Sequence, residues 1–512
     1  MTVVWGWSRL WLCAGLALLL VPSAVMAQAG PVLRVGMGVD CRTLDPTQTT
    51  ILVDFECMKP VLETLVIRDP VTREVVPHLA TGWSVSEDGR TWRFYLRQGV
   101  RFHDGTPFNA EAVKFNIDRF LDPATGTQFI SLLDMVEEVT VVNEYTVDIT
   151  TKFPFAPLLV HLAYPATAIS SPAQVRAMGA NYGRHPVGTG PYKFAGQESG
   201  RYVYHVANPD YWGGPPKLAG IRFIPIVDPA TRVAALEAGN IDIAVRIPYH
   251  EVERLRRVPG IRLIETQSSR IQYVGINVTR KPLDDVRVRR ALNHAVDKQA
   301  IVQAILLGNG AVVDSVVGPG AFGYAPVMQY EYDPRKARQL LAEAGYPNGF
   351  EVDFYISPGR YTSDGEIAQA VANYLEQIGL RVNLRRLEWS TYLGLLNKPA
   401  AQSEHDLFLL GWGWASGDAH QGLTALFLSG EASNRGYYSN PKVDALLRRQ
   451  AETVDPAERA AVIKQAMEII MGDAPWIFLV NQGLVTAVRS NVHDVMVPAD
   501  EMLDLSKAYK VD

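Results

Sequence analysis

The chain has 512 residues, 47% of them hydrophobic, and a formal net charge of −5. It carries no basic block and no acidic tail, so nucleic acid and anionic membrane surfaces are poor partners for it. A chain of this length exceeds what one hydrophobic core serves, which predicts two or three lobes.

The N-terminus has the pattern of a secretory signal. An apolar run from Leu10 to Val21 follows Arg9, and Val25-Met26-Ala27 supplies the small residues that signal peptidase needs. The run is too short to cross a bilayer and no stop-transfer run follows it. We therefore expect residues 1–27 to be a cleaved signal peptide and the mature protein to be soluble in the periplasm or another extracytoplasmic space.

The first strand is predicted from Leu33 to Val39, where apolar residues alternate. It ends in the loop Asp40-Cys41-Arg42, whose side chains are free to meet a ligand. The two cysteines of the mature chain, Cys41 and Cys57, either form a disulfide or lie apart as buried thiols, and the sequence leaves both interpretations open.

A small sheet-rich domain is predicted over about residues 66–187. Alternation on both sides of Asp88-Gly89 indicates a hairpin between Trp83 and Arg97. A second hairpin is predicted between Val139 and Ile149, and Asn109 is expected to cap a helix between the two.

The segment Val187 to Tyr192 is glycine-rich, but no Lys-Ser or Lys-Thr follows it, so we interpret it as a tight crossing between lobes rather than a phosphate cradle. Strands then alternate with helices, which indicates an α/β fold. Helices are predicted after Asp228-Pro229, Asp285 and Asp333-Pro334. The arginines of the second of these helices are predicted to form a solvated face, with docking to a partner as the alternative: Arg287, Arg289 and Arg290.

The stretch Asp406 to Asp418, DLFLLGWGWASGD, begins as an apolar run of strand length and breaks at Gly411. Trp412 and Trp414 follow. Indole rings at the mouth of a strand make good walls for a ligand, whereas the alternative places both residues in the core at alternating strand positions.

Motifs for catalysis and for metal binding are missing from the sequence. The ten histidines show no metal-ligand spacing, and no Gly-x-Ser-x-Gly elbow or Walker motif occurs. Ser416 with His420 is a local nucleophile and base, but no third residue nearby orients them. We therefore expect no cofactor and no metal, and favour a receptor over the alternative of an exported hydrolase.

Six stretches resemble the extracytoplasmic solute-binding proteins of the peptide, nickel and opine family (family 5), which serve ABC importers. They occur in the family's order over nearly all of the mature chain: LATGWSVSEDGRTWRFYLRQGVRFHDGTPFNAEAV from Leu79, VGTGPYKF from Val187, NPDYW from Asn208, ALEAGNIDIA from Ala235, PLDDVRVRRALNHAVDKQAIV from Pro282, and YDPRKARQLLAEAGYPNGF from Tyr332.

The resemblance implies a two-lobed clam fold of α/β halves, the type II, cluster C fold of periplasmic binding proteins, with an additional small α+β domain inserted in the first lobe. The first lobe is expected at residues 30–65, 188–275 and 480–512, the inserted domain at 66–187, and the second lobe at 276–479. It also implies that ligand binds between open lobes and that the closed form, a monomer, docks on membrane permease subunits.

Within the family, GWGWASGDAHQGLTALF from Gly411, YYSNPKVDALL from Tyr437 and the RIPYHEV run from Arg246 are most similar to glutathione- and dipeptide-binding members. The implied cargo is a short peptide or a glutathione-like molecule. A nickel chelate, an opine, haem or a sugar is the alternative that the family allows.

The same resemblance implies site residues. Arg360, beside Tyr361, matches an arginine that holds the ligand carboxylate in dipeptide-binding relatives, and a guanidinium suits that task. Peptide-binding relatives carry an aspartate for the ligand amine where this chain has Ala415. Asp418 is then either the amine acceptor or a loop cap. The ligand-binding residues expected are Asp40, Cys41, Arg42, Arg360, Tyr361, Trp412, Trp414, Ala415, Ser416 and Asp418.

Overall fold

The computed structural model of the chain describes residues 1–2, 30–414 and 416–511. Residues 3–27 of the predicted signal peptide, its cleavage site after Ala27, and Ala415 lie outside the described residues.

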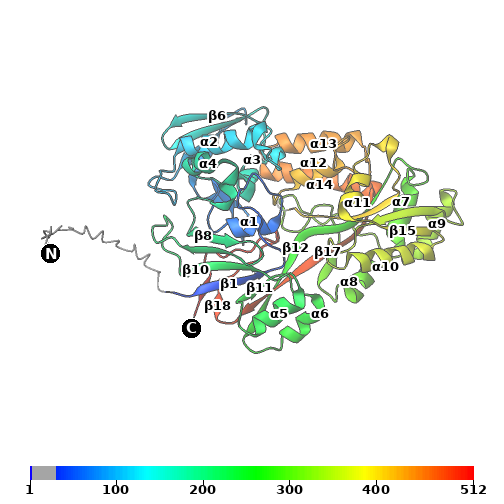
Figure 1. Cartoon of the computed structure of the whole chain (residues 1–512). Helices are drawn as coiled ribbons and strands as arrows, with labels where there is room; N and C mark the ends of the chain where they lie inside the picture. The colour runs from blue at the N-terminus through cyan, green and yellow to red at the C-terminus, as the bar shows by residue number, and fades with distance from the viewer. Residues whose placement is uncertain (3–29, 415, 512) are drawn as a thin grey trace.

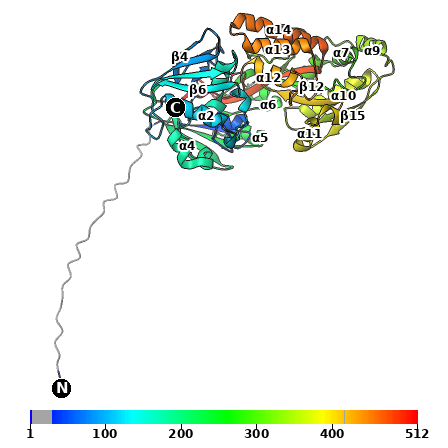
Figure 2. The same ribbon diagram turned by 90° about the horizontal axis from the view of Figure 1, so that it is seen from above.

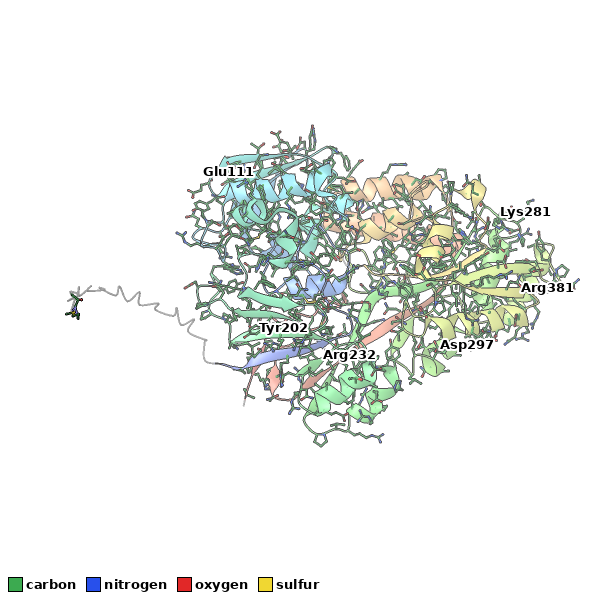
Figure 3. All side chains as sticks on the ribbon, viewed as in Figure 1. Glu111, Tyr202, Arg232, Lys281, Asp297 and Arg381 are labelled. Atoms are coloured by element: carbon green, nitrogen blue, oxygen red, sulfur yellow. A yellow bond between two sulfur atoms is a disulfide. The ribbon has the colours of Figure 1, made fainter. Side chains whose placement is uncertain are left out.

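One eleven-stranded sheet runs the length of the molecule (Figure 1). Its order is β15-β14-β16-β12-β17-β11-β1-β10-β9-β8, and β13 pairs with β17. Tyr202 of β9 and Arg381 of β15 lie toward opposite ends of it (Figure 3). The strands are β1 (Val32–Met37), β8 (Tyr192–Glu198), β9 (Tyr202–Ala207), β10 (Gly220–Pro225), β11 (Ile243–Ala244), β12 (Ile261–Ile276), β13 (Gly310–Val312), β14 (Glu351–Ile356), β15 (Arg381–Arg386), β16 (Leu407–Trp412) and β17 (Trp476–Arg489).

The sheet belongs to two lobes, which lie side by side (Figure 2). Strands β11, β1, β10, β9 and β8 form the sheet of lobe I, which also carries α5 (Pro229–Glu237) and α6 (Tyr249–Leu255). Strands β14 to β16 belong to lobe II. Among the described residues, only the long antiparallel strands β12 and β17 continue through both lobes, so they are the crossing strands.

Lobe II has helices on both faces of its sheet, so its strands are apolar on both faces as well. Residues of β14, β16 and β17 contribute to two separate cores, one on the side of α7 to α10 and one on the side of α11 to α14. These helices are α7 (Val286–Ala295), α8 (Lys298–Ala304), α9 (Pro334–Glu343), α10 (Asp364–Gln377), α11 (Trp389–Leu396), α12 (Ala419–Phe427), α13 (Pro441–Glu452) and α14 (Pro456–Asp473).

The small domain is built on a four-stranded antiparallel sheet of order β4-β5-β7-β6, and both predicted hairpins are confirmed. Trp92 and Phe94 are buried while Arg93 and Tyr95 are exposed, as alternation along β5 predicts. Asn109 caps α2 by accepting a hydrogen bond from Ala112 N at 3.1 Å. The remaining helices and strands in this part of the chain are α1 (Leu52–Met58), β2 (Val66–Arg68), β3 (Val75–Pro77), β4 (Ala80–Val85), β5 (Thr91–Leu96), α2 (Ala110–Leu121), β6 (Val136–Asn143), β7 (Thr146–Thr151), α3 (Leu158–Leu162) and α4 (Pro172–Met178), and near the C-terminus β18 (Val492–His493) pairs with β19 (Tyr509–Lys510).

The segment from Val187 to Tyr192 packs against the residues after α1. A Cβ at Gly190 would lie 2.5 Å from Pro60 O, so only glycine fits there. Beside it, the buried carboxylate of Glu63 accepts hydrogen bonds from Thr189 Oγ1 (2.6 Å), Tyr211 Oη (2.6 Å) and Trp212 Nε1 (2.9 Å). A Cβ at Gly188 would be at least as close to Val61 O, so both glycines of this segment serve close packing between segments.

The arginine face predicted on α7 is partly wrong. Arg287 and Arg290 are exposed, but Arg289 is buried and donates to the main-chain oxygens of Asp473, Leu283 and Asp284. A guanidinium has enough donors to bond several carbonyl groups at once. The positions of charged residues along the helix do not show that Arg289 binds main-chain oxygens instead of facing solvent. Within residues 1–2, 30–414 and 416–511, no helix is long and apolar enough to cross a membrane.

Candidate functional site

The crossing strands are interrupted where they pass between the lobes. The pairing of β12 with β17 shifts register between Gln267 and Ile271. In this interval Ser268 and Ser269 are buried, and Asn481 Nδ2 of β17 donates to Arg270 O at 2.7 Å. Irregular pairing of this kind redirects side chains and is common beside functional sites.

The turn after β14 carries Arg360 and Tyr361 to the crossing strands. Gln482 Nε2 donates to Thr362 O at 2.7 Å, and Tyr361 Oη donates to Gly411 O at 3.1 Å. The structure thus brings Tyr361 to the tryptophan stretch. Arg360 is exposed, with its guanidinium carbon 5.1 Å from the ring centre of Trp389.

Trp412, the last residue of β16, and Trp414 differ in exposure. Trp414 is 2% exposed and belongs to a core of lobe II, and a Cβ at Gly422 would lie 2.3 Å from its ring. Trp412 is half-buried. Of the two interpretations of the sequence, the core one describes Trp414, whereas Trp412 keeps part of its ring free to contact a ligand.

Asp418 is the N-cap of α12 and is completely buried. Its oxygens accept hydrogen bonds from Arg459 Nη1 at 2.7 Å and Arg459 Nη2 at 2.6 Å, and one of them also accepts from His420 N at 2.7 Å. Burial alone raises the pKa of this carboxyl, but the bonds to Arg459 and His420 hold it below its ordinary value. The cap interpretation is confirmed, and an ammonium group at Asp418 would have to share oxygens that Arg459 already uses.

Ser416 and His420 are not hydrogen-bonded to each other. Ser416 Oγ is buried without a hydrogen-bond partner among the described residues, while His420 Nδ1 is 2.6 Å from Gln450 Nε2. Burial also lowers the pKa of His420 to about 3, which makes it a poor base.

The loop after β1 lies in lobe I. Asp40 accepts hydrogen bonds from Ser199 Oγ (3.0 Å) and Gly200 N (2.7 Å), and Arg42 is exposed. Cys41 and Cys57 form a disulfide with their Cα atoms 6.7 Å apart. Of the two interpretations left open by the sequence, the disulfide is the one found. The disulfide joins this loop to α1.

A cluster of four charged residues at the lobe boundary was not predicted as a site: Glu56 of α1, Arg246 after β11, Arg270 of β12 and Glu501. Arg270 Nε lies 3.1 Å from Glu501 Oε1, and Arg246 Nη1 lies 4.0 Å from Glu56 Oε2. Arg270 also reaches lobe II, since a Cβ at Gly413 would lie 3.0 Å from its Nη2. These residues come from distant parts of the chain and share no local motif.

Two members of this charged cluster have left-handed backbone conformations. The φ angle is 52° at Arg246 and 70° at Glu501. For residues other than glycine this conformation costs roughly 1–3 kcal/mol, and such strain gathers at ligand-binding sites. The strain was not visible in the sequence, because neither position carries glycine or asparagine.

A cavity of about 300 Å³ borders the cluster at Glu56. Its walls come from α1 and the residues after it, from β2, from the C-terminal segment 494–507 and, in lobe II, from Ser416. The size is that of a small-molecule site. Among the described residues, no group of three or more His, Cys, Asp or Glu side chains is placed to hold a metal ion.

Two α/β lobes joined by crossing strands, with a mixed-charge cluster at their boundary, define a two-lobed solute-binding protein. The family model of the bacterial extracellular solute-binding proteins, family 5, matches residues 74–434. The chain belongs to this family, as its sequence motifs predict.

Individual relatives match over nearly the whole chain. The glutathione-binding protein GsiB of Pectobacterium atrosepticum is 34% identical over 508 residues, which cover 98% of each chain. The structure of HbpA2 from Haemophilus parasuis superimposes with a TM-score of 0.85 at 29% identity, covering 94% of this chain and 100% of the other. The structure of the periplasmic binding protein DppA of Helicobacter pylori, in complex with the peptide STSA, superimposes with a TM-score of 0.80 at 27% identity. The superposition covers 94% of this chain and 98% of the other. The predicted two-lobed fold with an inserted domain is thereby confirmed.

Proposed function

We propose that this protein is the substrate-binding component of an ABC importer, and that it captures a short peptide or a glutathione-like molecule between its lobes. The observation that carries the proposal is the charged cluster of Glu56, Arg246, Arg270 and Glu501. Such ligands are zwitterions, and a site for them needs carboxylates for the ammonium group and guanidinium groups for the carboxylates. The similarity to a glutathione-binding protein and to a peptide complex supports the same ligand class.

The mechanism is ligand-driven closure. The free protein samples open and closed arrangements of the lobes, and a ligand that contacts both lobes favours the closed one by its better affinity for that state. The crossing strands β12 and β17 are the elements that bend, because they continue through both lobes. The closed monomer then docks on permease subunits, and the ligand leaves unchanged, so the protein is not an enzyme.

The domain limits support this mechanism. We propose lobe I at residues 30–65, 188–275 and 480–512, the small domain at 66–187 and lobe II at 276–479. The limits 275/276 and 479/480 then fall inside the crossing strands β12 and β17. The family's extracytoplasmic location and the apolar N-terminal run support export through a cleaved signal peptide.

Titration calorimetry on the purified mature protein tests the function. Reduced glutathione and the peptide Ser-Thr-Ser-Ala are the first ligands, and we expect saturable binding of at least one of them at one molecule per chain. Mass spectrometry of the ligand after incubation checks that it is unaltered. Chemical change of the ligand that is lost in Ser416→Ala would instead support a hydrolase, and binding only of a nickel chelate, an opine, haem or a sugar would move the cargo to those classes.

A further inference from the structure

The cavity beside the charged cluster contains buried acceptors that the protein itself leaves unused. Glu56 is 3% exposed and lines the cavity. Its Oε1 accepts a hydrogen bond from Leu503 N at 3.3 Å, whereas its Oε2 has no hydrogen-bond partner among the described residues. Arg246 Nη1, at 4.0 Å, is beyond hydrogen-bond distance of that oxygen. A buried polar oxygen without a hydrogen-bond partner carries a cost, so this one calls for a partner from outside the chain.

A residue of the other lobe with a second unpartnered acceptor lines the same cavity. Ser416 is 3% exposed, lines the cavity and has no hydrogen-bond partner for its Oγ among the described residues. The carboxylate of Asp500 also lines the cavity and forms no ion pair within 4.0 Å to a described basic side chain. Residues with unpartnered acceptors therefore line one cavity from both lobes, and a ligand that reaches both would favour the closed state.

The basic residues of the cavity wall do not fill this need. Arg68 Nη2 donates to Gly320 O at 2.9 Å, and Lys59 forms no ion pair within 4.0 Å to a described acidic side chain. Burial raises the pKa of Glu56 and of Asp500 above the ordinary range. The charges of Arg246 and Lys59 lower the pKa of Glu56 only in part, and those of Lys59 and Arg68 do the same for Asp500. A metal ion is a poor candidate too, since no group of metal-ligating side chains is assembled among the described residues.

We propose that this cavity is the subsite for a primary ammonium group of the ligand, with Glu56 and Ser416 as the acceptors from the two lobes. An ammonium group carries three donors, which match a carboxylate oxygen on one side and a hydroxyl on the other. The inference rests on the proposed function, because it locates one end of that ligand. It also assigns the amine end to α1 of lobe I, away from Asp418, which is bonded to Arg459.

A double comparison of ligand and variant tests the subsite. Wild type and Glu56→Gln are each titrated with glutathione and with glutathione acetylated on its amino group, and likewise with Ser-Thr-Ser-Ala and its N-acetyl form. We expect Glu56→Gln to weaken binding of the free amines by about 10- to 100-fold, the loss of one charged hydrogen bond. The same variant is expected to bind the acetylated forms as wild type does. Ser416→Ala is expected to bind the free-amine ligands about 2- to 10-fold more weakly than wild type does.

Proton release gives an independent readout. Glu56 must be ionised to receive an ammonium group, and burial keeps its pKa raised in the empty cavity. Just above the ordinary titration range of glutamate, binding is therefore expected to release protons, seen as a binding enthalpy that depends on the ionisation enthalpy of the buffer. This dependence is expected to shrink in Glu56→Gln.

Asp54→Asn is the matched control. Asp54 lies two residues before Glu56 on α1 and is equally buried, but its oxygens accept bonds from Thr49 Oγ1 (2.6 Å) and Arg42 N (2.8 Å). Its substitution is expected to lower thermal stability without changing the preference for a free amine.

Three results overturn the subsite while leaving the function intact: equal affinity of wild type for free and acetylated ligands, unchanged affinity in Glu56→Gln, or equal losses for both forms of the ligand. If wild type binds none of the four ligands, the proposed function fails for these classes and the subsite fails with it.

Discussion

Asp418 shows how a residue with two interpretations in the sequence acquires one role in the structure. Its position before a helix predicts a cap, and the cap is found. Its pairing with Arg459, 41 residues away, was not predictable, because no local pattern links the two positions. Asp418 as a ligand contact stays a prediction, and stability measurements separate the roles.

Replacing Asp418 by Asn leaves Arg459 as a buried charge without its partner. We expect the free energy of unfolding to fall by about 3–5 kcal/mol, measured by chemical denaturation. Adding Arg459→Gln removes the isolated charge and should recover a large part of the loss. Ligand affinity per folded molecule is expected to remain within about threefold of wild type, because a substitution far from the ligand changes the binding free energy little. A loss of affinity at unchanged stability would make Asp418 a ligand-binding residue instead.

Arg360 keeps its guanidinium exposed beside the ring of Trp389. Arg360→Ala is expected to weaken binding of ligands with a free carboxylate by roughly 1.5–3 kcal/mol, the range for a hydrogen bond to a charged group. Arg386→Ala, another exposed arginine of lobe II, is the control. Calorimetry with a peptide and its C-terminal amide is the measurement, and an equal response to both would remove Arg360 from the site.

At the scale of elements, Glu63 links segments that are far apart in the sequence. Besides the bonds from Thr189, Tyr211 and Trp212, its carboxylate lies 2.8 Å from His78 Nε2. Burial opposes ionisation, but the bonds from His78, Thr189 and Tyr211 outweigh it and hold the pKa of Glu63 below its usual range. These bonds fix the residues after α1 to the end of β3, to the segment from Val187 to Tyr192, and to the loop between β9 and β10.

We expect Glu63→Gln to lower the free energy of unfolding at pH 7 by about 3 kcal/mol, since it breaks a buried charged network. A folded pKa below the unfolded one gives stability that is present above the unfolded value and lost as the pH falls below it. The difference between variant and wild type should therefore shrink on acidification below about pH 4.3, the unperturbed value for glutamate. Glu74→Gln, at an exposed glutamate, should change neither quantity.

Most elements were predictable from local signals. The Asp-Pro helix starts, the capped α2 and the two hairpins follow from side-chain chemistry within a few residues. The charged cluster was not predictable from local signals, because Glu56 and Glu501 are 445 residues apart in the sequence and come together only in the folded protein. Arg289 was predicted to face solvent because the periodicity of the helix does not show that main-chain oxygens of another segment, such as Asp473 O, will lie beside it.

At the scale of the whole molecule, the small domain and lobe II meet across two histidines. The rings of His161 of α3 and His420 of α12 are 6.0 Å apart, and Phe155 packs against both. Ala156 N also donates to Ala451 O at 2.9 Å across this contact. Burial lowers the pKa of His161 to about 4 and that of His420 to about 3. Among the described residues that face the pair, Asp418 favours the protonated rings, while Arg459 disfavours them.

This contact predicts acid sensitivity. A histidine whose folded pKa is depressed contributes stability above its unfolded pKa of about 6.5, and that contribution is lost as the pH falls below this value. At pH 5, each of the two histidines is expected to have lowered the free energy of unfolding by about 2 kcal/mol relative to its value above pH 6.5. Melting curves between pH 8 and 5 should show a smaller fall in melting temperature for His161→Gln than for wild type. The exposed His185→Gln is the control, and equal slopes for all three proteins would contradict the prediction.

The Cys41–Cys57 disulfide ties the residue after Glu56 to the loop after β1. Closing a loop of this length removes about 3 kcal/mol of chain entropy from the unfolded state. Material produced in a reducing cytosol will therefore contain molecules with separate thiols and a less firmly held α1. A ligand titration on such a mixture will report two affinities, and an oxidised preparation will report one.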